Sequence, residues 1–185
     1  NKPFMLNLGI QHPHQAWETI PSDDERYDPN SIPLPENHEQ RSPIGNQLAS
    51  SLQPEHTPEE WRRFISRYYT SVTQVDKAIG EIISKLEERG LADNTILLLN
   101  SDHGEMMGQF GRMQKMCLYE EAIHGPLLVW GAGIPHGERR PHLGQQIDIL
   151  PTLLDFAGVD IPEHVEGVSL KDTITQGKNP DRDYV

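Results

Sequence analysis

Residues 95–115 read TILLLNSDHGEMMGQFGRMQK, and this stretch decides the fold that we predict. The run Ile96–Leu99 is apolar, is bounded by polar residues and is too short for a free-standing helix, so it predicts a buried strand. Asp102 and His103 follow at the end of this strand, which is where open α/β sheets place their ligands. Lys115 brings a cation back after a glycine-rich turn. An anion held between a divalent metal and a lysine is the simplest chemistry that this pattern serves.

The segments around this strand alternate between strand and helix patterns. A long amphipathic helix is expected from 58 to 89, because Thr57 and Glu60 form a capping-box pattern and Gly90 suits the left-handed position after the helix. Strands are expected at 4–10 and 127–130, and shorter helices at 117–123, 149–157 (capped by Asp148) and 169–175. This alternation indicates an α/β fold with a mostly parallel sheet flanked by helices on both faces.

Composition restricts the partners and the domain organisation. The net charge of −12, from 16 basic and 28 acidic residues, argues against nucleic acid or an anionic membrane as a partner. One cysteine, Cys117, excludes an internal disulfide. No apolar run reaches the length of about 20 residues that crosses a bilayer. The chain begins with an apolar strand and ends at Tyr184-Val185 with residues typical of the start of another strand, so we expect a piece of a longer protein. Residues 1–178 are expected to form part of one domain, with a long loop at 18–58. Residues 179–185 are expected to start a following strand or C-terminal subdomain.

Two histidines flank a proline directly after the first expected strand. Pro13 keeps His12 out of the helical region, so His12 and His14 project from a loop at a strand end. The structural alternative is a pair of loop histidines that bond to nearby carbonyl groups. Asp23-Asp24 has no preceding apolar strand, and we interpret it as a solvated turn.

Four motifs in this order carry a resemblance to a known family. They are the strand with His12-Pro13-His14, the segment 91–95 that leads into Ser101-Asp102-His103-Gly104-Glu105, Lys115 followed by Tyr119-Glu120-Glu121-Ala122, and the segment 148–158. Together they resemble the sulfatases of the alkaline phosphatase superfamily. The resemblance implies an alkaline phosphatase-like α/β fold, of which this chain is the later, incomplete part, with residues 1–178 as the later half of the catalytic domain.

The resemblance also implies roles for individual residues. Asp102 and His103 match metal ligands, and Lys115 matches a lysine that binds the sulfate. His14 matches a histidine that contacts the sulfate and assists the leaving oxygen, and His12 precedes it in the motif as a further candidate for substrate binding. The resemblance favours calcium as the ion. Manganese and zinc are alternatives, because His103 stands where many members carry Asn and an imidazole ligand suits a softer ion than calcium.

The nucleophile of the family is not found in this chain. Family members use a cysteine or serine converted to formylglycine, within Cys/Ser-x-Pro/Ala-x-Arg, and the residues after Cys117 do not match. The first metal-binding Asp pair is missing too, so this piece alone is predicted to be inactive. Gln109-Phe110 stands where relatives often carry an acid and a histidine, and His124 stands where an arginine is common. We therefore expect altered specificity at the former and assign the latter no catalytic role.

Two alternatives stay open beside a sulfatase. A phosphodiesterase or phosphonate monoester hydrolase of the same superfamily would use the same tetrahedral geometry. The second alternative is a non-catalytic module that binds anionic saccharides through His14 and Lys115. For a sulfatase, the partner is a small sulfate ester, with a sulfated saccharide as one candidate, and an exported setting (periplasmic, extracellular or lysosomal) is favoured by the resemblance only.

Overall fold

The computed structural model describes residues 2–14, 17, 23, 26–40, 56–180 and 182. The chain forms two compact units, Asn1–Lys85 with His103–His124, and Leu86–Asp102 with Gly125–Val185. Much of the expected loop at 18–58, and most of the expected strand start at 179–185, lie outside the described residues. Within the described ranges, no helix combines the length and apolar character needed to cross a membrane.

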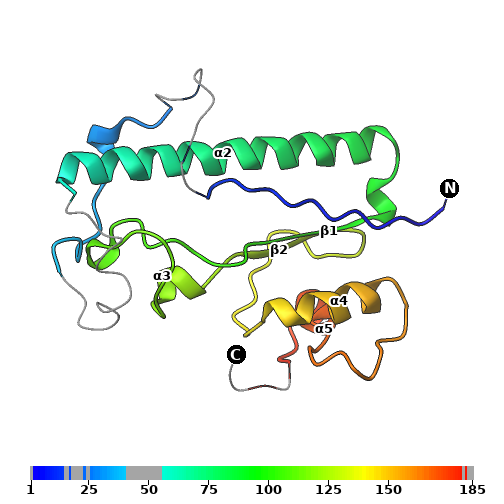
Figure 1. The fold of residues 1–185 in the computed structure, drawn as a ribbon. Helices are drawn as coiled ribbons and strands as arrows, with labels where there is room; N and C mark the ends of the chain where they lie inside the picture. Colours follow the sequence, from blue (N-terminus) through cyan, green and yellow to red (C-terminus); the bar gives the residue numbers. More distant parts are fainter. Residues whose placement is uncertain are drawn as a thin grey trace. The chain divides into compact units, whose positions relative to one another are not determined.

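The long helix predicted from the sequence is confirmed as α2, Pro58–Glu88, which runs for 31 residues (Figure 1). Its start is a capping box in which the Glu60 N–H donates to Thr57 Oγ1 at 3.2 Å and the Thr57 N–H donates to Glu60 Oε2 at 2.8 Å. Gly90 follows its end with φ +64°, a conformation that costs glycine little. Most of this helix belongs to the first unit.

The buried face of α2 is more polar than its periodicity predicts. Its buried side chains are Trp61, Ile65, Ser66, Thr70 and Ser71, whereas the apolar side chain of Val72 is 43% exposed. The hydroxyl of Thr70 donates to the Ser66 carbonyl at 3.0 Å, and Ser66 donates to the Tyr27 carbonyl. These bonds satisfy the buried hydroxyl groups, so polar side chains on this face can pack against loop residues with only a small cost in free energy.

The expected strand at 4–10 does not form a β ladder in the described residues. Its large side chains are exposed, including Phe4 at 62%, Met5 at 77% and Leu6 at 67%. An extended segment becomes a strand only when a neighbour supplies backbone hydrogen bonds, and this segment pairs with neither β1 nor β2. The prediction of a paired strand here is therefore wrong for the chain as described.

The second unit holds the expected strand before Asp102. Strand β1, Ile96–Asn100, pairs with β2, Leu127–Gly131, in antiparallel register, with Ile96 opposite Gly131 and Asn100 opposite Leu127 (Figure 1). Both strands occur where the sequence predicts them. In a sheet predicted to be mostly parallel, an antiparallel pair is the less common arrangement. Antiparallel strands, unlike parallel ones, do not require a helical crossover between them.

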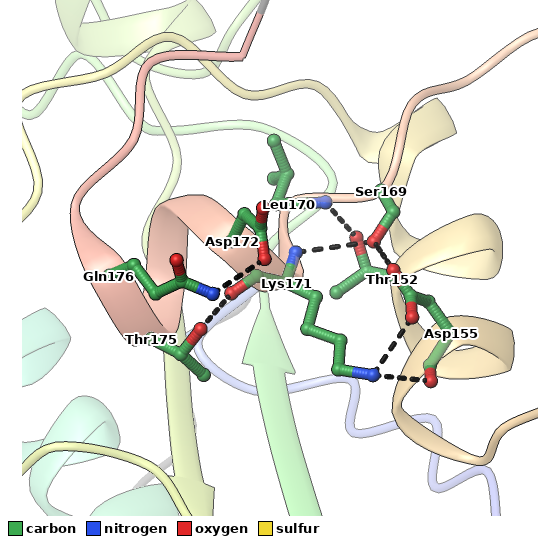
Figure 2. A network of polar contacts seen from close by, with 8 residues as sticks. All are labelled: Thr152, Asp155, Ser169, Leu170, Lys171, Asp172, Thr175 and Gln176. Atoms are coloured by element: carbon green, nitrogen blue, oxygen red, sulfur yellow. Dashed lines mark hydrogen bonds and ion pairs between the residues drawn. The ribbon is translucent and has the colours of Figure 1, made fainter.

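Two short helices complete the second unit: α4, Ile149–Phe156, and α5, Lys171–Gln176. Figure 2 shows how side chains of the α5 segment reach α4. Lys171 Nζ lies 2.9 Å from both the carboxylate and the carbonyl of Asp155, Ser169 donates to the same carboxylate at 2.6 Å, and the Leu170 N–H donates to Thr152 Oγ1 at 2.9 Å. This polar network fixes α5 against α4.

Asp148 does not cap α4 as predicted. Its carboxylate instead accepts the backbone N–H of Gln145 at 2.8 Å and that of Val168 at 2.9 Å. The guanidinium of Arg182 donates to both of its oxygens at 2.8 Å, and the Asp148 side chain is fully buried. The residue is thus a structural anchor, since a buried carboxylate needs such partners.

Short 3-10 turns link these elements in the described chain, at Pro29–Ser31, Ala92–Asn94, Gln109–Gly111 and Gln146–Asp148. The last helix of the first unit, α3, spans only Glu120–Ile123, which is shorter than the predicted 117–123.

Candidate functional site

The loop after His103 approaches α3 at close range in the first unit. The Gly104 N–H donates to the Ala122 carbonyl at 2.8 Å. A Cβ on residue 104 would collide with the Glu121 carbonyl, so only glycine fits here. This contact fixes the start of the loop that carries the candidate site residues.

The glycine-rich turn at the centre of the loop is held by packing on both sides. Gly108 adopts φ +95° and its Cα faces the Trp61 ring, where a Cβ would lie 3.4 Å from the indole. Phe110, at φ +52°, stacks on Tyr119 with ring centroids 4.5 Å apart and 23° between the planes. Phe110, of the Gln109-Phe110 pair, therefore forms an aromatic stack with Tyr119 at this turn. Such a stack stabilises the turn beyond the area that it buries.

The structure brings His14 and Lys115 together. Lys115 Nζ lies 3.0 Å from His14 Nε2, although the two residues are 101 positions apart. A lysine ammonium has no acceptor, so Lys115 donates and His14 Nε2 accepts. The imidazole is then neutral with its proton on Nδ1. A cation and a histidine side by side on one surface are suited to receive a tetrahedral anion.

His12 is placed differently from His14. Its Nδ1 lies 3.0 Å from the hydroxyl of Ser71, a fully buried residue of α2. Ser71 was not singled out from the sequence. The available signal was a hydroxyl residue on the buried stripe of an amphipathic helix, where an apolar residue is expected. The structure thus ties one histidine of the His12-Pro13-His14 motif to α2 and directs the other to Lys115.

The two candidate metal ligands are neighbours in sequence that belong to different units, His103 to the first and Asp102 to the second. His103 Nδ1 donates to the Gly104 carbonyl at 2.7 Å, which places the lone pair on Nε2. Metal-binding histidines commonly have their other nitrogen fixed in this way. Asp102 is exposed, and its backbone carbonyl accepts from Gln146 Nε2 at 2.6 Å. Among the described residues, no three His, Cys, Asp or Glu side chains gather closely enough to hold a metal.

Glu105 is an acid of this loop to which the sequence assigned no role. Its carboxylate accepts the backbone N–H of Gln114. Burial raises the pKa of Glu105, and its backbone hydrogen bonds and the nearby charges of Lys115 and His103 act in the opposite direction. Burial, together with the charge of Glu105, also raises the pKa of Tyr68 on α2. No local pattern marks Glu105, because the bond to Gln114 spans nine positions of an irregular loop.

The sequence also draws attention to four other residues, namely Asp23, Asp24, Cys117 and His124. Asp23 accepts from Lys77 at 3.1 Å, and this bond is the main cause of the lowered pKa of Asp23. Asp24 lies outside the described residues. Cys117 is half-buried, and His124 forms an exposed ion pair with Glu120 at 2.8 Å. These placements describe geometry, and the roles assigned to His12, His14, Asp102, His103 and Lys115 stay predictions.

Comparison with known proteins identifies the family. Residues 1–159 match the family model described as Sulfatase. The chain is 32% identical over 197 residues to an arylsulfatase of Clostridium perfringens (strain 13 / Type A), a match that covers 100% of this chain and 40% of that protein.

Two solved structures are similar in both sequence and fold. The phosphonate monoester hydrolase SpPMH from Silicibacter pomeroyi matches with a TM-score of 0.69 and 31% identity, covering 86% of this chain and 34% of that one. BT4656, solved in complex with its substrate D-glucosamine-2-N,6-O-disulfate, matches with a TM-score of 0.64 and 30% identity, covering 77% of this chain and 29% of that one.

These likenesses confirm the predicted alkaline phosphatase-like α/β fold class. The chain spans 40% or less of the length of each of the three proteins. The family model covers most of the chain, including all five candidate site residues. The chain therefore belongs to the sulfatase family.

Proposed function

We propose that this chain contributes the later part of the active site of a metal-dependent sulfatase, which hydrolyses a sulfate ester. In this proposal His14 and Lys115 contact the sulfate, and Asp102 and His103 bind the metal. The observation that carries it is the pairing of Lys115 Nζ with His14 Nε2 at 3.0 Å. Membership of the sulfatase family gives this pairing its chemical meaning.

Lys115 and His14 would divide the work on the substrate between them. The Lys115 ammonium donates to a non-bridging oxygen of the sulfate and neutralises part of its charge. His14, once protonated at Nε2, donates to the bridging oxygen as the alcohol leaves. Histidine suits this step because its side chain exchanges a proton near neutral pH. Their contact at 3.0 Å places both groups side by side, and binding of the sulfate would replace that contact with bonds to the oxygens of the ester.

The residues present fit a divalent metal in part. The bond from His103 Nδ1 to the Gly104 carbonyl leaves the neutral Nε2 as the donor atom, which is the form that a ligand needs. Asp102 adds a carboxylate, the donor that calcium prefers, while the imidazole keeps manganese and zinc as alternatives. When bound, such an ion supplies positive charge that polarises the ester and its attacking group. Two donors are too few for any of these ions, so in our proposal further ligands come from beyond the described residues.

The nucleophile also lies outside this chain in our proposal, as a formylglycine made from cysteine or serine. Cys117 is not a candidate, because Leu118-Tyr119-Glu120-Glu121 follows it in place of the family pattern. This chain alone is therefore expected to be inactive.

The substrate class is narrowed by the similar proteins. BT4656 acts on a disulfated glucosamine, which supports a sulfated saccharide as substrate. The likeness to SpPMH favours phosphonate monoester hydrolysis as the second candidate function. The net charge of −12 argues against nucleic acid or an anionic membrane as partner. An exported setting rests on the family resemblance alone.

Parallel assays of the full-length protein on an aryl sulfate and an aryl phosphonate monoester test the proposal. We expect the sulfate ester to have the higher kcat/KM. We also expect Lys115→Ala to lower that value by about 10- to 150-fold, the range for losing one charge-assisted hydrogen bond. Preferred turnover of the phosphonate would make the second candidate correct. Sulfate binding without turnover of either ester would indicate the non-catalytic module.

The control variant is Lys178→Ala, which removes a surface lysine that pairs with Asp172 at 2.7 Å. It should leave both kcat/KM values unchanged, because Lys178 pairs with Asp172 and neither residue is a candidate ligand of the metal or the sulfate.

A further inference from the structure

Glu105 and Lys115 stand at the two ends of the same loop, and hydrogen bonds close that loop between them. The Met106 N–H donates to the Gln114 carbonyl at 3.0 Å, and the Glu105 carboxylate accepts the Gln114 N–H. Both backbone polar groups of Gln114 are thus held by the residues that open the loop. The Met106 side chain between them is fully buried, so this end of the loop has a packed base.

Gln114 adopts a backbone conformation that a non-glycine residue does not favour. Its φ is +66°, in the left-handed region. A residue with a Cβ loses roughly 1 kcal/mol there relative to the right-handed region, so it stays only when its surroundings hold it. The bonds to Glu105 and Met106 provide that hold, and they act on the residue directly before Lys115.

The direction of the Lys115 side chain depends on this conformation. A change of φ at Gln114 would rotate the backbone that carries Lys115 and move its ammonium away from His14 Nε2, now 3.0 Å distant. Met106 contributes only its backbone, whereas Glu105 contributes a side chain that substitution can remove. We propose that Glu105 is a positioning residue, which holds Gln114 in its left-handed conformation so that Lys115 faces His14. The effect on sulfate rests on the function proposed above, whereas the effect on the loop does not.

Two conservative variants separate the effect of side-chain length at position 105 from the effect of its negative charge. Glu105→Gln keeps the length of the side chain and an oxygen acceptor, but it removes the charge. Glu105→Asp keeps the charge, but it withdraws the carboxylate by one methylene from the Gln114 N–H. If Glu105 acts through its hydrogen bond, the glutamine variant behaves like the wild type and the aspartate variant does not. A role for the negative charge itself predicts the reverse order.

The experiment uses the full-length protein and three measurements. Hydrogen exchange of the 106–116 segment reports on the loop without any substrate. Calorimetry with inorganic sulfate reports on the anion contact, and turnover of an aryl sulfate separates KM from kcat. Metal content is measured alongside, because His103 is close in sequence. Glu163→Gln and Glu163→Asp, at an exposed position of the second unit, are the matched controls.

We expect Glu105→Asp to speed exchange of the Gln114 amide and to weaken sulfate binding by about tenfold, the scale of one lost hydrogen bond to a buried partner. Its KM should rise more than its kcat falls. Glu105→Gln should match the wild type within about twofold in each measurement, since the acceptor is retained. Any other order of the two variants in the exchange measurement overturns the proposal.

The proposed function can be refuted independently of the role of Glu105. A wild-type protein that neither binds sulfate nor cleaves the aryl sulfate would refute that function, while exchange at Gln114 would still test the role of Glu105.

Discussion

The contact between His14 and Lys115 predicts that substitutions of the two residues interact in their effects on turnover. His14→Ala and Lys115→Met each remove one partner of a 3.0 Å contact. Each change alone should lower kcat/KM for an aryl sulfate by about 10- to 150-fold, the range for a hydrogen bond that involves a charged group. Once one partner is lost, the other is no longer directed at the sulfate, so the second substitution costs less.

The size of this interaction follows from the geometry and the exposure of the pair. Residues in contact couple by roughly 0.5–3 kcal/mol in double-mutant cycles. His14 is exposed and Lys115 is half-buried, so water screens their contact and places the coupling near the lower end, at about 1 kcal/mol. The double variant should therefore retain about fivefold more activity than the product of the single effects.

The assay is kcat/KM of the full-length protein with an aryl sulfate for the wild type, both single variants and the double variant. A second cycle pairs Lys115→Met with His164→Ala, an exposed histidine of the second unit, and should be additive. Additivity of the His14 cycle within about 0.3 kcal/mol would refute the reasoning, because residues that serve one anion at contact distance do not act independently.

Three further predictions address the metal, the anchor and the α4–α5 network. Asp102→Ala should abolish metal-dependent turnover and lower the metal content measured by mass spectrometry; unchanged activity and metal would refute its assignment as a ligand. Asp148→Asn should lower the free energy of unfolding by about 3 kcal/mol in urea, because it leaves the Arg182 guanidinium without its carboxylate partner. Arg182→Met in the same background should recover part of the loss, and a change below about 1 kcal/mol would show that the pair is not an anchor. Asp155 has a pKa lowered mainly by the hydrogen bond from Ser169 and then by Lys171, so its contribution is present at neutral pH and is lost as the pH falls through the pKa of the folded state. Asp155→Asn should therefore cost about 0.5 kcal/mol at pH 7, a small value because the side chain is 37% exposed, and this cost should shrink as the pH falls through the folded-state pKa of Asp155; a cost that does not change with pH would contradict this explanation.

The elements that depend on local pattern could be predicted from the sequence. The capping box at Thr57, the glycine at 90 and the apolar run at 96–99 each act within a few residues, and α2 and β1 form where they indicate. The segment 4–10 has an equally apolar pattern, but a strand also requires a partner from elsewhere, which local sequence does not provide. Burial of Ser71 in place of Val72 reflects which part of the chain packs against α2.

In the candidate site, too, some features could be predicted from the sequence and others depend on distant partners. The resemblance to the sulfatases selected His14 and Lys115, and the structure places them in contact across 101 positions. Ser71 and Glu105 were missed because their partners, His12 and Gln114, lie on irregular loops whose course no periodicity reveals. The sequence favours Asp148 as a cap because Asp before a helix commonly caps it, but Arg182 and two backbone N–H groups occupy its carboxylate in the structure.

The most direct test of the central claim is a crystal structure of the full-length protein with inorganic sulfate and its metal bound. We expect the sulfate within hydrogen-bond distance of Lys115 Nζ and His14 Nε2, and the metal coordinated by Asp102 and by Nε2 of His103. A sulfate bound elsewhere, or an Asp102 carboxylate on a different face from the His14 imidazole, would contradict the account.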